Sequence, residues 1–294
     1  MPGHPFDVNQ DPFEAARPRI RGLAYRMLGT FAEADDVAQD TWLRWQAAGT
    51  DIANAEAWLI TVATRLCLDR LRAAARSREV YPGPWLPEPI VTQPGPESAA
   101  ELSDSLTLGF LVLLDQLAPV ERAVFVLADV FDVPYAEIAT TVSRSPAACR
   151  QIASRARRRL RPDKLPAHPA AVDVELVRGL LRALASGDVN EVVTRLAPHV
   201  VCVTDGGPGH RAARRPVVGS ALVARFLVGA ARRYGRHLVS RPAIVGGSAG
   251  AILSAGETVE QVLAVASKDG VITSVYVILN PAKLASVGHQ PVMD

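Results

Sequence analysis

The sequence predicts a multidomain protein: two all-α blocks, the second containing a helix-turn-helix, followed by an α+β domain. Three observations support this prediction. Apolar residues recur at helical spacing in both blocks, and a proline-rich segment separates them. The β-rich runs, with the hairpin signal Lys268-Asp269-Gly270, are confined to the last part of the chain. With 294 residues, the chain is long enough for two or three domains.

Composition sets the expected boundaries. The first helical block covers residues 8–78 and the second covers 104–165. Between them, residues 79–103 are rich in proline and glycine, which favours an extended linker.

The last domain is expected at 169–285, with two amphipathic helices first. Val192, Val193 and Leu196 lie on one stripe of the second of these helices. We expect a strand at 199–204, a helix at 219–234 and strands at 236–245, 249–256, 257–267 and 271–279. These strands predict an antiparallel sheet that curls around a helix-capped pocket.

A short arginine-rich helix ends the second block. Ser145 is placed to cap it, and Pro146 occupies the first helical position. One stripe is apolar, formed by Cys149, Ile152, Ala153, Ala156 and Leu160. The opposite face carries Arg150, Gln151, Ser154, Arg155, Arg157 and Arg158, side chains suited to phosphates and base edges. A short helix at 134–141 and a tight turn precede it, which is helix-turn-helix spacing. The alternative is an arginine-rich pair of surface helices.

Charge is unevenly distributed, although the net charge is only +2. Residues 144–165 contain eight basic side chains and one acidic one, whereas 31–58 contain six acidic side chains and one arginine. The three cysteines lie in apolar surroundings without zinc-ligand spacing and predict buried free thiols. We recognise neither a signal peptide nor a membrane span, so we expect a cytoplasmic protein without a metal or cofactor.

Two segments of the first block are ambiguous when taken alone. In 54–72, Thr61, Arg65, Asp69 and Arg72 recur on one helix face, which fits either a solvated surface or a nucleic-acid contact. The acidic segment 34–45 fits a surface helix with aromatic core contacts.

In order, these blocks resemble bacterial sigma factors of the extracytoplasmic-function (ECF) group. "ADDVAQDTWLRW" is similar to the region 2.2 helix, "NAEAWLITVATRLCLDRLR" to regions 2.3 and 2.4, and the segment from Leu117 to Leu160 to region 4. The resemblance implies binding to the RNA polymerase core, through the clamp helices of its largest subunit and its flap, and to promoter DNA.

The resemblance also implies roles for individual side chains. Residues expected to bind polymerase are Asp35, Asp36, Gln39, Asp40 and Arg44. Residues expected at the minus-ten element are Asn54, Trp58, Thr61, Arg65, Asp69 and Arg72, and a core position is the alternative for Trp58. Residues expected at the minus-thirty-five element are Ser145, Ala147, Arg150, Gln151, Ser154, Arg155 and Arg158.

The rest of the chain resembles the SigJ-like subgroup, which carries a fused SnoaL-like domain of the cone-shaped NTF2-like fold. Its motifs supply the expected interdomain regulatory residues, which are Trp85, Leu86, Pro87, Asp205, Gly206, Gly207, Asn280, Pro281, Lys283 and Leu284. Pro208-Gly209-His210 and Ala282 depart from the subgroup pattern. The resemblance implies regulation in cis without a separate anti-sigma factor. Trp85 either anchors the linker on another surface or packs locally, and Asp205 either starts a turn or forms an interface.

Two alternatives remain for the last domain and the whole chain. NTF2-like folds also host enzymes, and Asp205, His199 and His210 are the residues available for acid–base work. Without paired carboxylates or a nucleophile motif, we expect no enzyme, and binding of an unknown small ligand by this domain is left as an alternative. The whole-chain alternative is a helix-turn-helix regulator with an NTF2-like ligand-sensing or enzymatic domain.

Overall fold

The computed structural model describes residues 11–48, 52–78, 81, 83–92, 107–160, 173–209 and 211–287. The expectations for His210, for most of the second half of the linker and for residues 161–172 lie outside this part of the chain. The chain forms two compact units. One contains Met1–Glu79 and Leu113–Pro162, and the other contains Val80–Val112 and Asp163–Val292.

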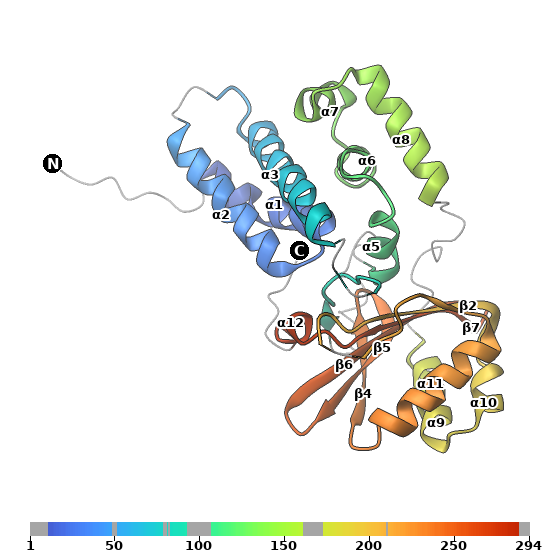
Figure 1. The fold of residues 1–294 in the computed structure, drawn as a ribbon. Coiled ribbons are helices and arrows are strands. Elements are labelled where there is room, and N and C mark those ends of the chain that lie inside the picture. Colours follow the sequence, from blue (N-terminus) through green and yellow to red (C-terminus); the bar gives the residue numbers. More distant parts are fainter. Residues whose placement is uncertain are drawn as a thin grey trace. The chain divides into compact units, whose positions relative to one another are not determined.

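The first unit is helical, and its elements are shown in blue and green in Figure 1. Its first block consists of α1 (Pro12–Leu28), α2 (Phe31–Ala47) and α3 (Ala55–Arg78). Asp11 begins α1 by accepting a hydrogen bond from the Phe13 N–H at 2.9 Å. Gly29, with φ of 82°, ends it.

The second block of this unit ends in the expected helix-turn-helix. It contains α6 (Pro119–Phe125), a π-helical turn (Val126–Val130), α7 (Tyr135–Val142) and α8 (Pro146–Leu160). Helix α5 (Leu108–Leu114) precedes them, and its residues up to Val112 belong to the second unit. Ser143 has φ of 55° in the turn. The Ser145 hydroxyl accepts a hydrogen bond from the Ala148 N–H at 3.1 Å, so the expected cap is present. The five residues of the expected apolar stripe of α8 are all buried.

The second unit is an α+β domain, which confirms the predicted class. Its helices are α9 (Val174–Ser186), α10 (Val189–Val193), α11 (Ser220–Tyr234) and α12 (Pro281–Leu284). Its strands are β1 (Val91–Thr92), β2 (Leu196–Asp205), β3 (Val217–Val218), β4 (Val239–Val245), β5 (Ser248–Ala255), β6 (Thr258–Lys268) and β7 (Val271–Ile278). Asp269 and Gly270 both have positive φ in the β6–β7 hairpin, as the turn signal predicts.

Three details differ from the sequence-based expectation. The sheet, with order β1-β4-β5-β6-β7-β2-β3, is mixed because β2 pairs in parallel with β7. Leu196 belongs to β2 and not to the preceding helix, because α10 ends at Val193. The linker contributes an edge strand, since Val91 pairs with Val245. Periodicity within a segment does not specify which distant segment lies beside it, so these pairings were missed.

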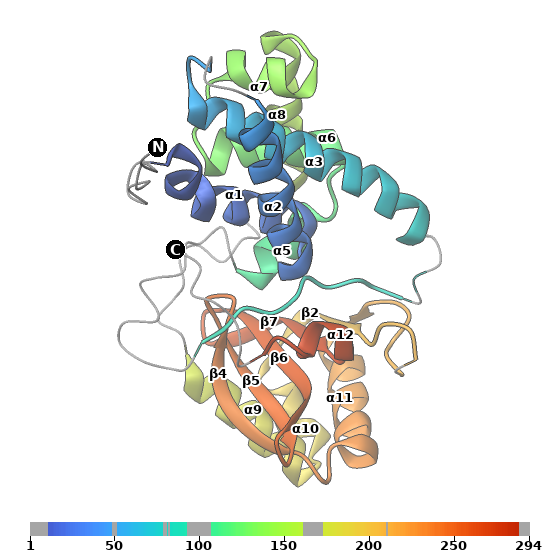
Figure 2. The same cartoon turned by 90° about the vertical axis from the view of Figure 1, so that its left-hand side faces the viewer.

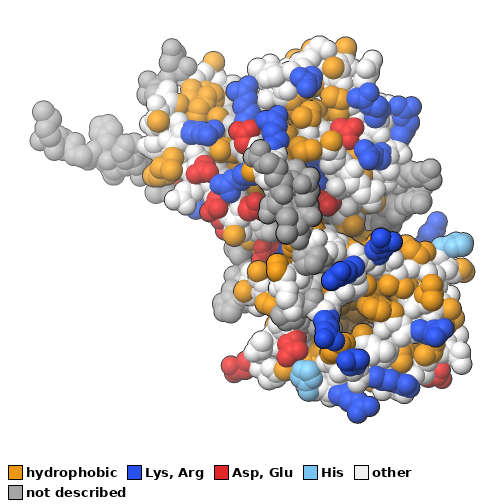
Figure 3. Space-filling view, viewed as in Figure 1, with side chains coloured by type: hydrophobic (Ala, Val, Ile, Leu, Met, Phe, Trp, Pro, Cys, Tyr) orange, Lys and Arg blue, Asp and Glu red, His pale blue; other side chains and the backbone are white. Residues whose placement is uncertain are grey.

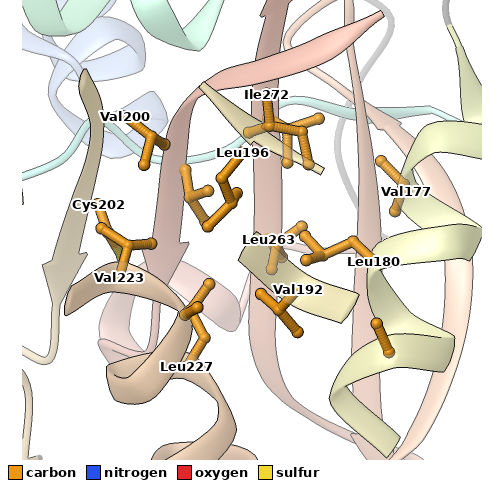
Figure 4. Close-up of a cluster of buried hydrophobic side chains, with 14 of the residues drawn as sticks. Val177, Leu180, Val192, Leu196, Val200, Cys202, Val223, Leu227, Leu263 and Ile272 are labelled. Atoms are coloured by element: carbon orange, nitrogen blue, oxygen red, sulfur yellow. The ribbon is translucent and has the colours of Figure 1, made fainter. Parts of the chain in front are cut away.

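Both faces of the sheet are covered. Figure 2 shows α9, α10 and α11 on one side, and Figure 4 shows the aliphatic cluster that they bury, including Leu180, Val192 and Leu263. On the other side, Leu86 of the linker and Leu108 pack with Val262 and other residues of the sheet. This explains the continuous apolar run 262–265, in which alternate side chains point to opposite, equally buried faces.

Candidate nucleic-acid interface and linker clamp

Helix α8 presents the predicted minus-thirty-five side chains to solvent. Ser145, Ala147, Arg150, Gln151, Ser154, Arg155 and Arg158 are all exposed. Their arrangement follows from the buried stripe, which fixes the rotation of α8 against α6 and α7. Arg150 also lies over the Tyr135 ring, with its guanidinium carbon 5.8 Å from the ring centre.

Two arginines of α8, Arg157 and Arg159, are held by ion pairs and are less available for contact with DNA. Arg157 donates to Asp129 at 2.7 Å and to the Tyr135 hydroxyl at 3.1 Å, and these hydrogen bonds raise its pKa. Arg159 pairs with Glu121 at 3.4 Å. Arg157 is exposed, as expected for the outer face, but its guanidinium also braces α8 against the preceding turn.

Helix α3 carries the predicted minus-ten residues, but part of its face is occupied by α7. The Thr61 and Thr141 hydroxyl oxygens lie 3.0 Å apart. Arg65 donates to the Thr141 carbonyl at 3.2 Å and to the Thr140 carbonyl at 3.0 Å. These carbonyls end α7, where backbone acceptors lack helical partners and the helix dipole favours a cation.

The remaining minus-ten candidates have identifiable local contacts. The Asn54 side chain accepts a hydrogen bond from the Ala57 N–H at 3.0 Å, at the start of α3. Trp58 is half-buried and contacts Trp45, with ring centres 5.8 Å apart. Asp69 and Arg72 form an exposed pair at 3.0 Å. Trp58 thus retains both its packing role and a partly accessible ring.

Two further arginines connect the helical blocks of the first unit in the same way. Arg19 donates to the Phe131 carbonyl at 2.8 Å, just after the π-helical turn. Arg122 is buried and donates to the Met27 carbonyl of α1 at 2.8 Å and to Asp115 at 2.7 Å. Arg19 and Arg65 of the first block therefore bind carbonyls of the second block, and Arg122 of the second block binds a carbonyl of the first, in each case at or near the end of a helix. Sequence reasoning missed this pattern, since it depends on tertiary contacts.

The predicted polymerase-binding residues follow α2 on its outer side. Asp35, Asp36, Gln39 and Arg44 are exposed, and Asp40 is half-buried. Arg70 of α3 pairs with Asp36 at 3.3 Å and with Asp40 at 2.8 Å. Trp42 and Leu43 are 39% and 52% exposed, so the expectation of aromatic core contacts is wrong for Trp42. This face combines carboxylates with exposed apolar groups, which suits a protein partner.

The second unit contains a cluster that we call the linker clamp, formed by Tyr81, Leu86, Asp205, Asn280 and Lys283. Asp205 is fully buried at the end of β2. One of its carboxylate oxygens, Oδ2, accepts hydrogen bonds from the Leu86 N–H at 2.8 Å and from the Lys283 ammonium at 2.6 Å. Its other oxygen accepts from the Tyr81 hydroxyl and, at 3.0 Å, from the Gly207 N–H. Asp205 therefore forms a turn and holds the linker at the same time.

Lys283 completes the linker clamp from α12. Its ammonium also donates to the Leu86 carbonyl and lies 4.0 Å from the centre of the Trp85 ring. The side chain is 6% exposed, so the charge is held by the carboxylate, the carbonyl and the ring. Trp85 thus packs on Lys283 of the second unit.

The other interdomain candidates support this geometry. Asn280 donates to the Tyr81 hydroxyl at 3.1 Å and caps α12 through the Ala282 N–H. Gly207 has φ of 61°, and a Cβ there would lie 2.6 Å from the Asn280 amide carbon. Gly206, Pro87 and Leu284 are buried, whereas Pro281 is exposed at the first position of α12. Sequence reasoning missed Tyr81 and the hydrogen bond from Ser286 to buried Glu88.

Two of the three groups considered for catalysis lie in the described part of the chain, and His210 does not. Asp205 is engaged in the linker clamp, and His199 is exposed on β2. Among the described residues, no group of three His, Cys, Asp or Glu side chains could hold a metal ion. In the same residues, no helix is both long and apolar enough to cross a membrane.

Comparison with known proteins identifies the two helical blocks. Sigma-70 region 2 matches residues 13–77 and Sigma-70 region 4 matches 108–160. The ECF RNA polymerase sigma factor SigJ of Mycobacterium tuberculosis is 39% identical over 285 residues, covering 92% of this chain and 91% of the relative. The probable ECF sigma factor SigI of the same species is 31% identical, covering 93% and 95%.

A solved structure agrees with these matches. The crystal structure of M. tuberculosis SigJ has a TM-score of 0.75 and 36% identity, covering 95% of this chain and 98% of that one. The region 2 match covers a block that a simple helix-turn-helix repressor would not need, so the alternative is not supported. The chain belongs to the ECF RNA polymerase sigma factors.

Proposed function

We propose that this sigma factor rests in a closed form, in which region 4 masks part of the minus-ten face of region 2. The observation that carries the proposal is the contact of Thr61 and Arg65 with the end of α7. Side chains that hold α7 carbonyls cannot simultaneously bind promoter DNA. Opening of the first unit is therefore required before both promoter elements are recognised.

Distance supports the same conclusion. The minus-ten and minus-thirty-five elements are separated by roughly 85 Å of duplex, at 3.4 Å per base pair. Helix α8 starts five residues after Thr141 and has 15 residues, a length of about 22 Å. With Thr141 in contact with Thr61, α8 cannot reach an upstream element while α3 occupies the downstream one.

We assign the surfaces as follows. The exposed predicted face of α8 reads the minus-thirty-five element, and Arg65, Asp69 and Arg72, with Asn54, Trp58 and Thr61, form the minus-ten surface. The outer side of α2, extended by Arg70, Trp42 and Leu43, docks on the polymerase clamp helices. The supporting evidence is the exposure of the α8 side chains and of Trp42 and Leu43, together with the match to regions 2 and 4.

We further propose that the linker clamp restrains opening in cis. The linker joins region 2 to region 4, and its backbone at Leu86 is hydrogen-bonded to both Asp205 and Lys283. Because the C-terminal domain holds the linker, the linker is less free to move when regions 2 and 4 bind core polymerase. This arrangement favours control without a separate anti-sigma factor.

The C-terminal domain is proposed to act as a regulator and not as a catalyst. Aliphatic side chains form the cluster between its helices and sheet (Figure 4), and its buried aspartate is saturated with donors. A small ligand would act here by changing the packing of this domain and hence its hold on the linker.

The closed form can be tested by fluorescence energy transfer between labelled cysteines introduced by Ala73→Cys and Ala136→Cys on α3 and α7. The three native thiols are buried, and burial raises the pKa of each of them. For Cys202 the pKa is raised to about 12. They are therefore protonated near neutral pH and react slowly with labels. We expect high transfer in the free chain and a marked decrease when core polymerase is added. Unchanged transfer in an active holoenzyme would contradict the closed form.

The linker clamp can be tested with Trp85→Ala. This change removes the ring on Lys283 while keeping the buried Asp205–Lys283 pair. We expect more transcript per holoenzyme in run-off transcription, with unchanged affinity for core polymerase. Tyr234→Phe is the control, because it changes an exposed aromatic residue of the same domain while keeping the ring beneath Arg233. A decrease, or equal yields from the two variants, would argue against restraint.

A further inference from the structure

The C-terminal domain contains a long segment without any acidic residue. From Gly206 to Gly256 the sequence has eight arginines and no aspartate or glutamate. Seven of these arginines fall between residues 211 and 236, and we call them the basic face. They are Arg211, Arg214, Arg215, Arg225, Arg232, Arg233 and Arg236.

The basic face is exposed and belongs to one side of the second unit. All seven side chains are exposed. Figures 1 and 2 place α11 and the segment between β2 and α11 on the same side of this unit, and Figure 3 shows basic side chains gathered there. The buried stripe of α11, which includes Val223 and Leu227, rotates Arg225 and Arg232 outward.

The arginines of the basic face differ in their ion pairing from Arg178 and Arg182 of α9 and from Arg157 of α8. On α9, Arg178 and Arg182 both contact Glu175, and on α8 Arg157 contacts Asp129. Within the described residues, no carboxylate forms an ion pair with the basic face. Arg232 donates to the Gly187 carbonyl at 2.9 Å, and Arg233 lies over Tyr234. In the part of the domain that the structure describes, the positive charge of this surface is therefore not neutralised by carboxylates.

We propose that the basic face binds the sugar-phosphate backbone of duplex DNA beside the promoter, independently of sequence. Arg225 and Arg232 are two helical turns apart, about 10 Å. This span matches about three phosphates of one strand. Exposed Val218 and Leu222 lie between the two groups of arginines in the sequence and provide apolar contact area.

The arrangement favours an extended polyanion over other partners. The arginines are distributed along a loop and a helix, whereas a small anion requires donors that converge on one point. A positive patch also complements an acidic protein surface, and the test below separates that partner from DNA. The inference rests on membership in the sigma family, which brings the chain to DNA, and is independent of the linker clamp.

The test compares two double variants with equal change in charge. Arg215→Gln with Arg225→Gln removes two members of the basic face, whereas Arg178→Gln with Arg182→Gln removes two arginines that are paired with Glu175 on α9. Binding of the full chain to duplex DNA is measured by fluorescence anisotropy over a range of salt concentrations. Two lost phosphate contacts reduce the slope of log K against log salt by about 2, equally on promoter and unrelated duplexes.

The outcomes are distinct. Weaker, less salt-dependent DNA binding by the basic-face variant alone, with recovery by Arg→Lys at the same positions, supports the proposal. Identical salt slopes for both variants overturn it. Weaker binding to core polymerase with an unchanged DNA slope also overturns it and identifies a protein partner. Failure of the linker clamp test would leave this slope measurement unaffected.

Discussion

The two helices that carry predicted promoter contacts, α3 and α8, differ in how their polar faces are used within the first unit. The predicted face of α8 is exposed, with Arg155 and Arg158 pointing to solvent. On α3, Arg65 and Thr61 are already engaged by the end of α7. Similar sequence patterns thus produce one surface available for DNA and one partly occupied by protein.

The difference lies in what each face contacts. Helix α8 packs mainly through its apolar stripe, and within the described residues only Arg157 and Arg159 of its polar side form ion pairs with neighbouring segments, so the predicted minus-thirty-five side chains remain exposed. Helix α3 packs on α1 and α2 through apolar residues and also contacts α6 and α7. Recognition of the minus-ten element therefore competes with an internal contact, and this competition can be changed by mutation.

The largest expected effect comes from Arg122→Met, which removes the buried connection between the two blocks. The change leaves Asp115 and the Met27 carbonyl without this donor, at an expected cost of about 3 kcal/mol in the free energy of unfolding. Denaturant unfolding followed by circular dichroism measures it. Arg159→Met is the control, because its partner Glu121 is near the surface and such pairs contribute below about 1 kcal/mol. Equal destabilisation by both changes would show that Arg122 does not hold the blocks together.

A smaller effect is expected on the open face, from Arg155→Ala. If Arg155 contacts a base, minus-thirty-five binding weakens by about 1–3 kcal/mol, or roughly 5- to 150-fold. Holoenzyme binding to promoter fragments with intact or scrambled upstream elements measures this change. Arg157→Ala should have a weaker effect on discrimination, since that guanidinium is held by Asp129. Loss of affinity that is equal on both fragments would reassign Arg155 to the phosphate backbone.

The sequence is informative where local chemistry determines structure. Ser145, Pro146 and the apolar stripe specify α8 before any tertiary contact is known, and the same is true of the Asp269-Gly270 turn. The linker clamp was anticipated through motif resemblance, although the donors on Asp205 were not. Its geometry joins residues 81, 205 and 283, which no local pattern relates.

The missed features share a long-range origin. The parallel pairing of β2 with β7 depends on the arrangement of distant strands, and the linker strand β1 depends on a free edge at β4. One signal was present in the continuous apolar run 262–265. Such a run indicates a strand buried on both faces, and therefore a second covering layer, here provided in part by Leu86 of the linker.

The smallest expected effect distinguishes masking from DNA contact on α3. Thr141→Val removes a hydroxyl next to Thr61 from the region 4 side, without changing any predicted minus-ten residue. One lost hydrogen bond of this kind is worth about 1 kcal/mol, which would raise the open fraction about fivefold. The α3–α7 energy-transfer pair should report lower transfer in the free chain, whereas minus-ten selectivity in the holoenzyme should not change. Thr140→Val is the control, because its exposed hydroxyl bonds within α7 to the Ala136 carbonyl. If Thr141→Val altered selectivity instead of transfer, α7 would belong to the DNA-reading surface and the contact with α3 would not be a mask.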